Sequence, residues 1–477
     1  MGKKFDIHKF YKISLFFLDT LFILASFFLS ILLNNYRYPL AENYGYIIFI
    51  YLVTIFFYIY FDFYKYKSLK FIKRYLMNNI IINVIIFGLI TLFIFITPYG
   101  DKIIFINLYK YYILVYLLFF LIFRVALFKL FFNTLNKARR LNKNAVILGV
   151  NEESKKFYSL KNFIGFNCGL NIIGFIGPEG TLKKKTKDKN IELLGSTRDI
   201  LDLSGRYKFK DVFLIDSKLP TGNLINTVEY LRNNDFFIHI SDRKFDVLTD
   251  INQFEVYGSD DHFVDFSIKR LYYKKYFKFL FDYIFSVFIL VIISPFLLLL
   301  MLLIKSTSKG PALFIGKRIG LNKREFNFIK FRSMKHDTEE NIRVHRESIK
   351  SFYNSKESGK IKVYSSNQRI TRVGRFLRKF SLDELPQFIN VLKGDMSIIG
   401  PRPCMKYEAD YFKDWRKYRF DIKPGITGLW QAYGRSRVNF EKLSILEYYY
   451  YSNCSFSLDL KILFDTIKVM ILGIGGY

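Results

Sequence analysis

The chain has 477 residues, of which 51% are hydrophobic and 19% aromatic, and its mean hydropathy is positive at +0.13. This composition excludes an ordinary soluble single domain, and the length predicts two or three structural units. The formal net charge of +31 makes membrane lipid and phosphate-bearing substrates the expected partners. No nucleic acid partner is expected, because the Lys and Arg residues flank apolar segments and no nucleic-acid motif accompanies them.

Four apolar stretches fill the first third of the chain, at residues 13–33, 44–61, 80–97 and 109–132. Each is close to the ~20 residues that cross a bilayer, so we predict four transmembrane helices within residues 1–140. The first is expected to be a retained span, because no small-residue cleavage site follows it. Lys and Arg cluster before the first helix, between the second and third, and after the fourth, which predicts that both ends of this bundle face the cytoplasm.

Residues 141–268 carry short apolar runs at 145–150, 171–176, 211–215 and 236–240, separated by helix-compatible stretches. This spacing predicts a small Rossmann-like α/β domain with a parallel sheet. The first run ends in GVNEES at 149–154, where a dinucleotide-binding turn requires three glycines and only Gly149 is present. We therefore expect a structural or regulatory domain rather than a working NAD or FAD site.

The three cysteines, Cys168, Cys404 and Cys454, stand far apart and form no CxxC pair. Neither a disulfide framework nor a zinc site is indicated by this spacing. Burial or an unremarkable surface position is expected of each.

The third segment, residues 269–477, opens with an apolar run at 279–304 that Ser294-Pro295 interrupts. Proline lacks an amide donor and clashes with the preceding turn, so a sharp bend is expected there. Positive residues flank the run equally, which favours a re-entrant membrane helix hairpin that enters and leaves on one face, with its open backbone groups satisfied by Ser294 or neighbouring protein. The alternative is a fifth, kinked spanning helix, which would place the rest of the chain outside the cell.

Arginines recur at steps of three after residue 368 and would cover one broad face of a helix, with apolar residues opposite. Most are expected on solvent or lipid headgroups. A minority would hold phosphate, because a guanidinium donates two hydrogen bonds to phosphate oxygens. The arginines are Arg369, Arg372, Arg375 and Arg378, and the apolar residues are Ile370, Val373 and Leu377.

The tetrapeptide Ser381-Leu382-Asp383-Glu384 has the pattern of a helix capping box, in which Ser381 and Glu384 satisfy free amides. A helix start also binds phosphates, and an ionised carboxylate there can hold Mg²⁺ or attack phosphorus. The two interpretations are compatible, with Ser381 as the cap and Asp383 as the reactive group.

Five ordered motifs give the strongest signal in the chain. They are FIKFRSM at 328–334, RITRVGRFLRKFSLDELPQ at 369–387, LKGDMS at 392–397, GPRP at 400–403 and KPGITGLWQ at 423–431. Together they resemble the bacterial sugar transferase family, the monotopic polyprenyl-phosphate phosphoglycosyl transferases, from about residue 274 onward. The preceding bundle and Rossmann-like domain resemble the long-form members. Asn367-Gln368 stands where the family often has Asp-Pro, which is expected to alter a turn without removing activity.

The resemblance implies transfer of a sugar 1-phosphate from a UDP-sugar to undecaprenyl (polyprenyl) phosphate with release of UMP, the initiating step of bacterial surface polysaccharide or glycoconjugate synthesis. It implies a mainly α catalytic domain on the cytoplasmic face of the multi-pass inner (cytoplasmic) membrane, with Mg²⁺ as cofactor. Homo-oligomerisation is left open. The resemblance identifies neither the sugar nor the pathway.

Residue by residue, the resemblance implies that Asp383 is the nucleophile, forms a covalent phospho-sugar aspartyl intermediate and contacts Mg²⁺. Glu384 would assist the lipid acceptor as general base. Ser294 and Pro295 match the break of the re-entrant helix, and the loop at 423–425 would shape the nucleotide site. The phosphate or nucleotide-binding residues would be Lys330, Arg332, Arg378 and Arg402.

Two alternatives remain at this point. A membrane-anchored nucleotide-sugar dehydratase would also pair spanning helices with a Rossmann-like domain, but it needs the glycine turn that Asn151 and Ser154 interrupt. A non-catalytic scaffold of a polysaccharide-assembly complex would use the acids only as caps. UDP-sugar with Mg²⁺ should stabilise a transferase, NAD a dehydratase, and neither a scaffold.

Overall fold

The structure is a computed structural model of the chain, and it divides into two compact units, residues 1–142 with 165–169, and residues 143–164 with 170–477. It describes residues 7–33, 44–60, 102–119, 143–159, 170–177, 192–216, 218–241, 243–248, 255–256, 262–266, 276–334, 350–353, 370–434 and 438–471, with single positions at 88, 122, 343 and 347. The predicted third membrane stretch, apart from Gly88, lies outside the described residues, as do Cys168, Asn367-Gln368 and Arg369. The domain boundaries predicted at 140 and 268 stay predictions.

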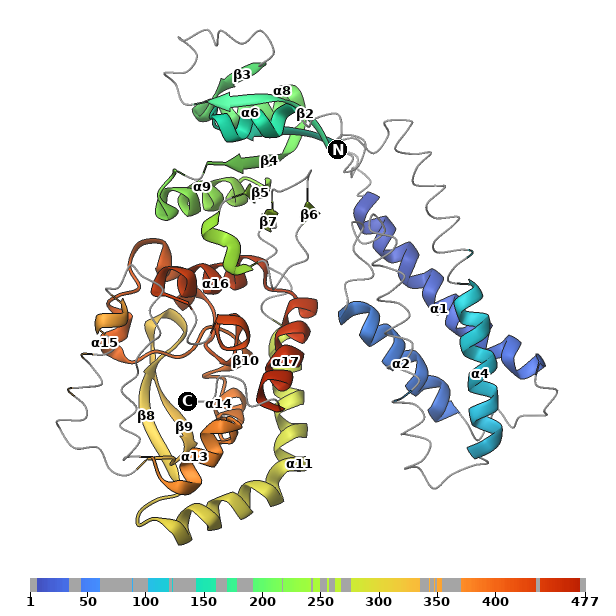
Figure 1. Cartoon of the computed structure of the whole chain (residues 1–477), viewed down its shortest axis with the longest axis vertical. Helices are drawn as coiled ribbons and strands as arrows, with labels where there is room; N and C mark the ends of the chain where they lie inside the picture. Colours follow the sequence, from blue (N-terminus) through green and yellow to red (C-terminus); the bar gives the residue numbers. More distant parts are fainter. Residues whose placement is uncertain are drawn as a thin grey trace. The chain divides into compact units, whose positions relative to one another are not determined.

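The first unit contains three described helices, α1 (Ile7–Leu33), α2 (Tyr44–Tyr60) and α4 (Lys102–Phe119), drawn in blue shades in Figure 1. Polar side chains of α1 such as Asp19 and Ser26 are fully buried, whereas Phe17 is 67% exposed. A few polar side chains buried among apolar ones, with apolar side chains on the outside, suit a lipid surrounding.

Among the described residues, one helix, Phe277–Thr307, is long and apolar enough to cross a membrane. The apolar parts of α1 and α4 are shorter, at Phe16–Leu32 and Lys110–Phe119. The four predicted crossings therefore stay a prediction.

The second unit begins with a seven-stranded mixed sheet of order β3-β2-β1-β4-β5-β7-β6. The first five strands pair in parallel, whereas β7 runs antiparallel to β5 and β6 antiparallel to β7. The four predicted strands are present, and the sheet has an antiparallel edge that was not predicted. The strands are β1 (Lys143–Leu148), β2 (Leu170–Gly177), β3 (Leu193–Ser196), β4 (Phe209–Ile215), β5 (Phe237–Ser241), β6 (Glu255–Val256) and β7 (His262–Phe266). The helices are α6 (Glu152–Ser159), η5 (Thr197–Asp199), α8 (Ile200–Tyr207), α9 (Thr221–Asn233) and η6 (Arg243–Leu248).

The crevice between β1 and β4 is the switch point at which this kind of sheet binds ligands. The amide of Asn151 closes it, because its nitrogen donates to the Ile215 carbonyl over 2.6 Å and its oxygen accepts the Ser154 amide over 2.7 Å. A side chain thus occupies the position where a glycine-rich turn would admit a pyrophosphate.

The helix α9 packs on α16 (Phe440–Asn453), a helix from the end of the chain. Arg232 of α9 is 1% exposed, and its guanidinium donates to the Ser452 carbonyl over 3.0 Å. Tyr448 of α16 donates its hydroxyl to Glu229 over 2.8 Å. A cation at the C-terminal end of α16 stabilises that end, so buried polar contacts join the α/β sheet to the rest of the second unit.

The apolar run forms α11 (Phe277–Thr307), and Figure 1 shows it as two arms set at an angle. Pro295 lies inside the helix and cannot donate to the Val291 carbonyl. The hydroxyl of Ser294 donates to that carbonyl instead, over 2.8 Å. The predicted bend at Ser294-Pro295 is therefore present, and Ser294 satisfies the freed backbone group as expected. Entry and exit on one membrane face stay a prediction.

The remainder of the second unit is mostly helical, with two small two-stranded sheets. The strands are β8 (Leu313–Ile319) and β9 (Glu325–Phe331), which pair antiparallel, and β10 (Ser397–Ile399) and β11 (Gly425–Thr427), which pair in parallel. The helical elements are η7 (Leu321–Lys323), α13 (Arg372–Lys379), η8 (Leu382–Glu384), α14 (Gln387–Leu392), α15 (Lys406–Ala409), η9 (Asp414–Asp421), η10 (Trp430–Gly434) and α17 (Phe456–Ile471).

The arginine-rich helix α13 is shorter than predicted. Thr371 caps its start by accepting the Gly374 amide over 2.8 Å, and Ile370 lies outside the helix in a bridge to Met334. The predicted capping box at Ser381 is wrong. Ser381 has a φ of 54° and makes no side-chain capping bond, because it takes the left-handed conformation with which the chain leaves α13.

Two buried polar side chains hold these elements together. Asp282 of α11 accepts the Ser397 hydroxyl over 2.7 Å and the Ile398 amide over 3.3 Å, which ties the apolar helix to β10. Asn390 of α14 accepts the Ile329 amide over 3.0 Å and donates to the carbonyl of residue 327 over 2.6 Å, which ties α14 to the edge of β9.

Replacing Asn390 by Leu should lower the unfolding free energy of the second unit by ~2–4 kcal/mol, because one buried amide and one partly buried carbonyl of β9 lose their partner. Denaturant unfolding in detergent measures the change. The exposed Asn171, which bonds Asn144, is the matched control, and Asn171→Ala should have little effect. Equal losses in the two variants would show that Asn390 does not hold β9.

Candidate active site

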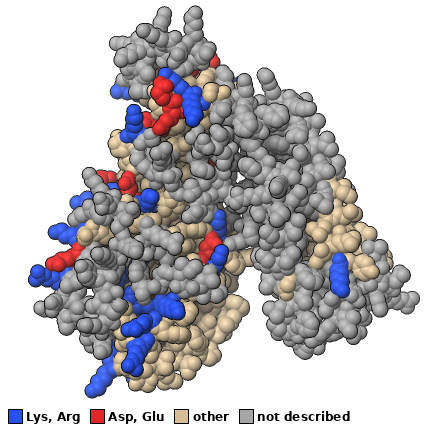
Figure 2. Space-filling model, viewed as in Figure 1, with Lys and Arg blue, Asp and Glu red and all other residues tan. Residues whose placement is uncertain are grey.

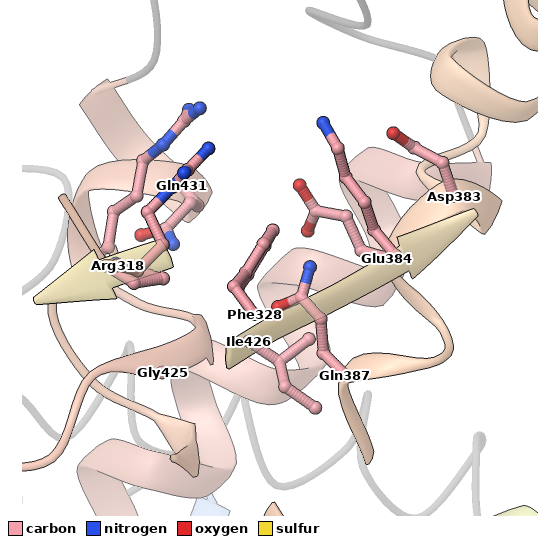
Figure 3. A pocket seen from close by; sticks show the side chains of 11 residues that line it. Arg318, Phe328, Asp383, Glu384, Gln387, Gly425, Ile426 and Gln431 are labelled. Carbon is pink, nitrogen blue, oxygen red and sulfur yellow. The ribbon is translucent and has the colours of Figure 1, made fainter. Parts of the chain in front are cut away.

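A pocket opens between β8, β9, η8, the start of α14, the loop that follows β10, and β11 with η10. Four of the predicted site residues line it, namely Lys330, Asp383, Glu384 and Arg402. Figure 3 shows the two acids on one side of the pocket and Arg318 on the other. The remaining lining residues are Phe328, Gln387, Pro403, Gly425, Ile426 and Gln431.

The strand β9 presents Phe328 and Lys330 to the pocket, because residues two apart on a strand share a face. The ammonium of Lys330 lies 5.3 Å from the centre of the Phe314 ring, on the neighbouring strand β8. Asn390 fixes this strand against α14, which starts three residues after Glu384. Lys330 thus lies on β9, the acid pair lies directly before α14, and a buried hydrogen bond joins β9 to α14.

Asp383 is buried, Lys330 is half-buried, and each acts on the ionisation of the other. Burial raises the pKa of Asp383, and the charges of Lys330, Arg378 and Arg402 lower it. Burial lowers the pKa of Lys330, whereas Asp383 and Glu384 raise it. A carboxylate and an ammonium that are both desolvated, and each perturbed by the other, are typical of a reactive site.

The opposite wall of the pocket is cationic. The guanidinium of Arg402 lies 5.4 Å from the centre of the Trp430 ring, and that of Arg318 lies 5.3 Å from the Phe328 ring. Burial lowers the pKa of Arg318, and Arg402 lowers it further. Two guanidinium groups beside Lys330 make this wall suited to a phosphate or diphosphate.

The wall owes its shape to a contact between two lengths of main chain. The Gly400 amide donates to the Thr427 carbonyl and the Gly425 amide to the Pro401 carbonyl, each over 2.9 Å. A Cβ at Gly425 would lie 2.0 Å from the Gly400 nitrogen, so only glycine fits. This contact explains the glycines in two of the five motifs without invoking substrate.

Two other predicted site residues lie outside the pocket lining. Arg332 donates to the carbonyls of Ser308 and Lys309, each over 2.8 Å, and so caps the C-terminal end of α11. Arg378 lies on α13 and acts on Asp383 through its charge. Their roles at a phosphate stay predictions, as does the role of Ser294 and Pro295 in a membrane.

Sequence reasoning did not select Arg318, Gln387 or Gln431 as site residues, yet all three line the pocket. In the sequence, Arg318 is one of several basic residues that follow the apolar run. A signal did exist, because Gln387 and Gln431 each end one of the five motifs. Nothing in the spacing of Arg318 indicates that β8 turns it toward Lys330.

Within the described residues, no group of three His, Cys, Asp or Glu side chains could hold a metal ion. Magnesium is often bound by one or two carboxylates together with substrate phosphates rather than by a protein cage. Asp383 and Glu384, adjacent in η8 and facing a cationic wall, fit that mode of binding.

Comparison with known proteins places the similarity on this pocket. The family described as Bacterial sugar transferase matches residues 273–473. The chain is 42% identical to the galactosyl transferase CpsE of Streptococcus agalactiae, 37% to the exopolysaccharide production protein ExoY of Sinorhizobium fredii and 39% to the undecaprenyl-phosphate galactose phosphotransferase of Salmonella typhimurium. These matches cover 35%, 41% and 43% of this chain and 36%, 86% and 42% of the relatives. The matched segment thus spans less than half the length of two of these relatives.

Replacing Lys330 by Met should raise the pKa of Asp383 further, because the charge that lowers it most is removed. The carboxyl should then stay protonated to higher pH. Carbodiimide labelling of Asp383 across a pH series, read by peptide mass spectrometry, measures this shift. Lys379→Met, an exposed lysine of α13, is the control and should leave the labelling curve in place. A curve that moves equally in both variants would contradict the assigned pairing.

Proposed function

The chain belongs to the bacterial sugar transferase family, and we propose that it transfers a sugar 1-phosphate from a UDP-sugar to undecaprenyl phosphate and releases UMP. The observation that carries this proposal is the pocket itself, in which the buried Asp383 faces Lys330 and Arg402. One relative is named an undecaprenyl-phosphate galactose phosphotransferase and another a galactosyl transferase. UDP-galactose is therefore the first donor to test.

In the first step, a carboxylate oxygen of Asp383 attacks the sugar-bearing phosphorus of the donor. A bond forms between this oxygen and phosphorus, and the bond from phosphorus to the bridging oxygen breaks, so that UMP leaves with the electron pair. Lys330 and Arg402 stabilise the charge that develops on the phosphate oxygens. The sugar phosphate is then held on Asp383 as an acyl phosphate.

In the second step, a phosphate oxygen of the lipid acceptor attacks the same phosphorus. The acyl phosphate bond breaks, Asp383 is released as a carboxylate, and a lipid diphosphate sugar is formed. Glu384, adjacent to Asp383 in the pocket, takes the proton of the incoming phosphate. Mg²⁺, when bound by Asp383 and the donor phosphates, supplies further positive charge at the leaving UMP.

The helix α11 suits a place within one leaflet of the membrane. Its apolar side chains are largely exposed, with Val291 at 68% and Leu302 at 67%, so they require an apolar surrounding. Figure 2 shows Lys and Arg side chains gathered beside the uncharged surface at the lower end of the second unit. Anionic headgroups would neutralise them, which holds the pocket at the cytoplasmic face of the inner membrane. The exposed cations near α11 include Lys305, Lys309, Lys317, Arg372, Arg375 and Lys379.

Asp383→Asn should lower UMP release from UDP-galactose by at least ~10³-fold and abolish the covalent intermediate, because the amide cannot attack phosphorus. UMP release by the full-length protein in detergent with Mg²⁺ and undecaprenyl phosphate gives the rate, and intact mass gives the intermediate. Glu384→Gln should still release one equivalent of UMP while losing lipid product.

The control is Asp410→Asn, an exposed carboxylate outside the pocket, which should retain full activity. Activity of Asp383→Asn equal to that of the wild type would reject the mechanism. Folded wild-type protein that releases no UMP from any UDP-sugar would reject the function and favour the scaffold.

The topology of α11 can be tested with cysteines at its two ends, Tyr276→Cys and Lys309→Cys, both exposed positions. A membrane-impermeant thiol reagent should label both from the cytoplasmic side, because the proposed hairpin enters and leaves the membrane on one face. The unsubstituted protein gives the background of its own cysteines. Labelling of the two positions from opposite sides would establish a spanning helix.

A further inference from the structure

The main chain of Arg402 is held by two side chains that do not line the pocket. Arg419 of η9 donates from Nη2 to the Arg402 carbonyl. The Glu447 carboxylate of α16 lies 3.2 Å from the same Nη2, and each of these two side chains is 5% exposed. A buried ion pair therefore lies directly behind a residue whose guanidinium lines the pocket.

The surroundings of this pair leave it little freedom. The Arg419 guanidinium carbon lies 3.7 Å from the centre of the Phe412 ring. The helix that carries Glu447 also carries Tyr450, whose hydroxyl donates to the Ile399 carbonyl over 3.0 Å. The turn between Ile399 and Arg402 is thus held at both ends by α16, at one end directly and at the other through Arg419.

The stability of the fold does not by itself explain such a pair. A buried ion pair costs desolvation energy, and well-packed apolar side chains of similar volume are often as stable. An ion pair does fix the orientation of the Arg419 guanidinium, because this group must contact both the Glu447 carboxylate and the Arg402 carbonyl. The oriented guanidinium in turn fixes the position of the Arg402 peptide group, whose carbonyl accepts its hydrogen bond.

We propose that Arg419 and Glu447 are positioning residues, which fix the main chain of Arg402 and so hold its guanidinium at the phosphates of the nucleotide-sugar. This rests on the proposed function, because it assigns Arg402 to the donor phosphates. Neither residue touches the substrate; both act through Arg402.

The ionisation of Glu447 gives the proposal a pH signature. Burial raises the pKa of Glu447 to about 7, against the lowering effect of Arg419 and of the Arg402 amide. The carboxylate is charged above this value and neutral below it, so the pair weakens as the pH falls below about 7. Activity should fall on the acid side accordingly. Among the described residues, Tyr353 and Cys404 are titratable groups that interact with this carboxylate, and burial raises the pKa of both. The charged Glu408 interacts with its partner Arg419.

The test compares Glu447→Gln with Glu229→Gln in the full-length protein. Both glutamates are buried and each pairs with a buried arginine. Glu447 belongs to α16, and Glu229 accepts a hydrogen bond from Tyr448 of the same helix, but it is Glu447 that lies behind Arg402. Glu447→Gln should lower kcat/KM for UDP-galactose by about 10- to 100-fold, because the buried charge of Arg419 loses the carboxylate that pairs with it. Glu447→Asp, which keeps the charge, should recover part of the activity, and Glu229→Gln should resemble the wild type.

Two readouts separate positioning from a general loss of structure. Where Arg402 is already replaced by Met, Glu447→Gln should add almost nothing, because the two changes act through the same group. The acid limb of the wild-type pH profile near 7 should be absent in Glu447→Gln. Independent, multiplicative effects of the two substitutions would overturn the proposal, as would equal losses in Glu447→Gln and Glu229→Gln.

Binding of UDP, measured by titration, distinguishes failure of this proposal from failure of the proposed function. Wild-type protein that binds UDP but releases no UMP would reject the function, and the affinity of Glu447→Gln for UDP would still decide the positioning. UDP affinity equal to that of the wild type would then overturn it. Wild-type protein that neither binds UDP nor releases UMP would overturn both.

Discussion

The pocket depends on a contact between two lengths of main chain that leaves no room for side chains. Gly400 and Gly425 exchange hydrogen bonds with the opposite segment, and a Cβ at Gly425 would overlap the Gly400 nitrogen. Because the contact is made by backbone, the two segments cannot slide past one another without losing buried hydrogen bonds. Arg402, two residues from one glycine, and Ile426, next to the other, therefore enter the same wall in a fixed relation.

Charge placement in the second unit follows from the cost of burying an ion alone. Lys330 and Asp383 are desolvated together, and Arg419 and Glu447 likewise. Each pair joins elements distant in sequence, so the electrostatic requirement also sets how β9, η8, η9 and α16 lie against one another. The result is a pocket whose dipoles and charges are oriented before an anionic substrate arrives, which reduces the reorganisation needed when it reacts.

The sequence predicted features that depend on neighbouring residues along the chain. The bend at Ser294-Pro295 follows from one missing amide, and four strands of the sheet follow from short apolar runs. The short strands β3 and β6 carry too few apolar residues for such a signal, and in β7 Asp265 interrupts the apolar run. The capping box failed because the preceding helix imposes the backbone conformation of Ser381. The motifs brought Lys330 and Asp383 to one site through resemblance, but Arg318 and Glu447 act through contacts across the fold, which spacing along the chain does not reveal.

The hydrogen bond between Asp282 and Ser397 has a consequence for synthesis. The two residues are 115 positions apart, so at ~5–20 residues per second Asp282 leaves the ribosome roughly 6 to 23 seconds before its partner exists. During that interval an apolar helix carries an unsatisfied carboxyl group in its first two turns. A carboxyl group is costly to bury in the bilayer without a partner. Until β10 is made, the N-terminal end of the nascent helix is therefore favoured at the water-exposed surface of the bilayer.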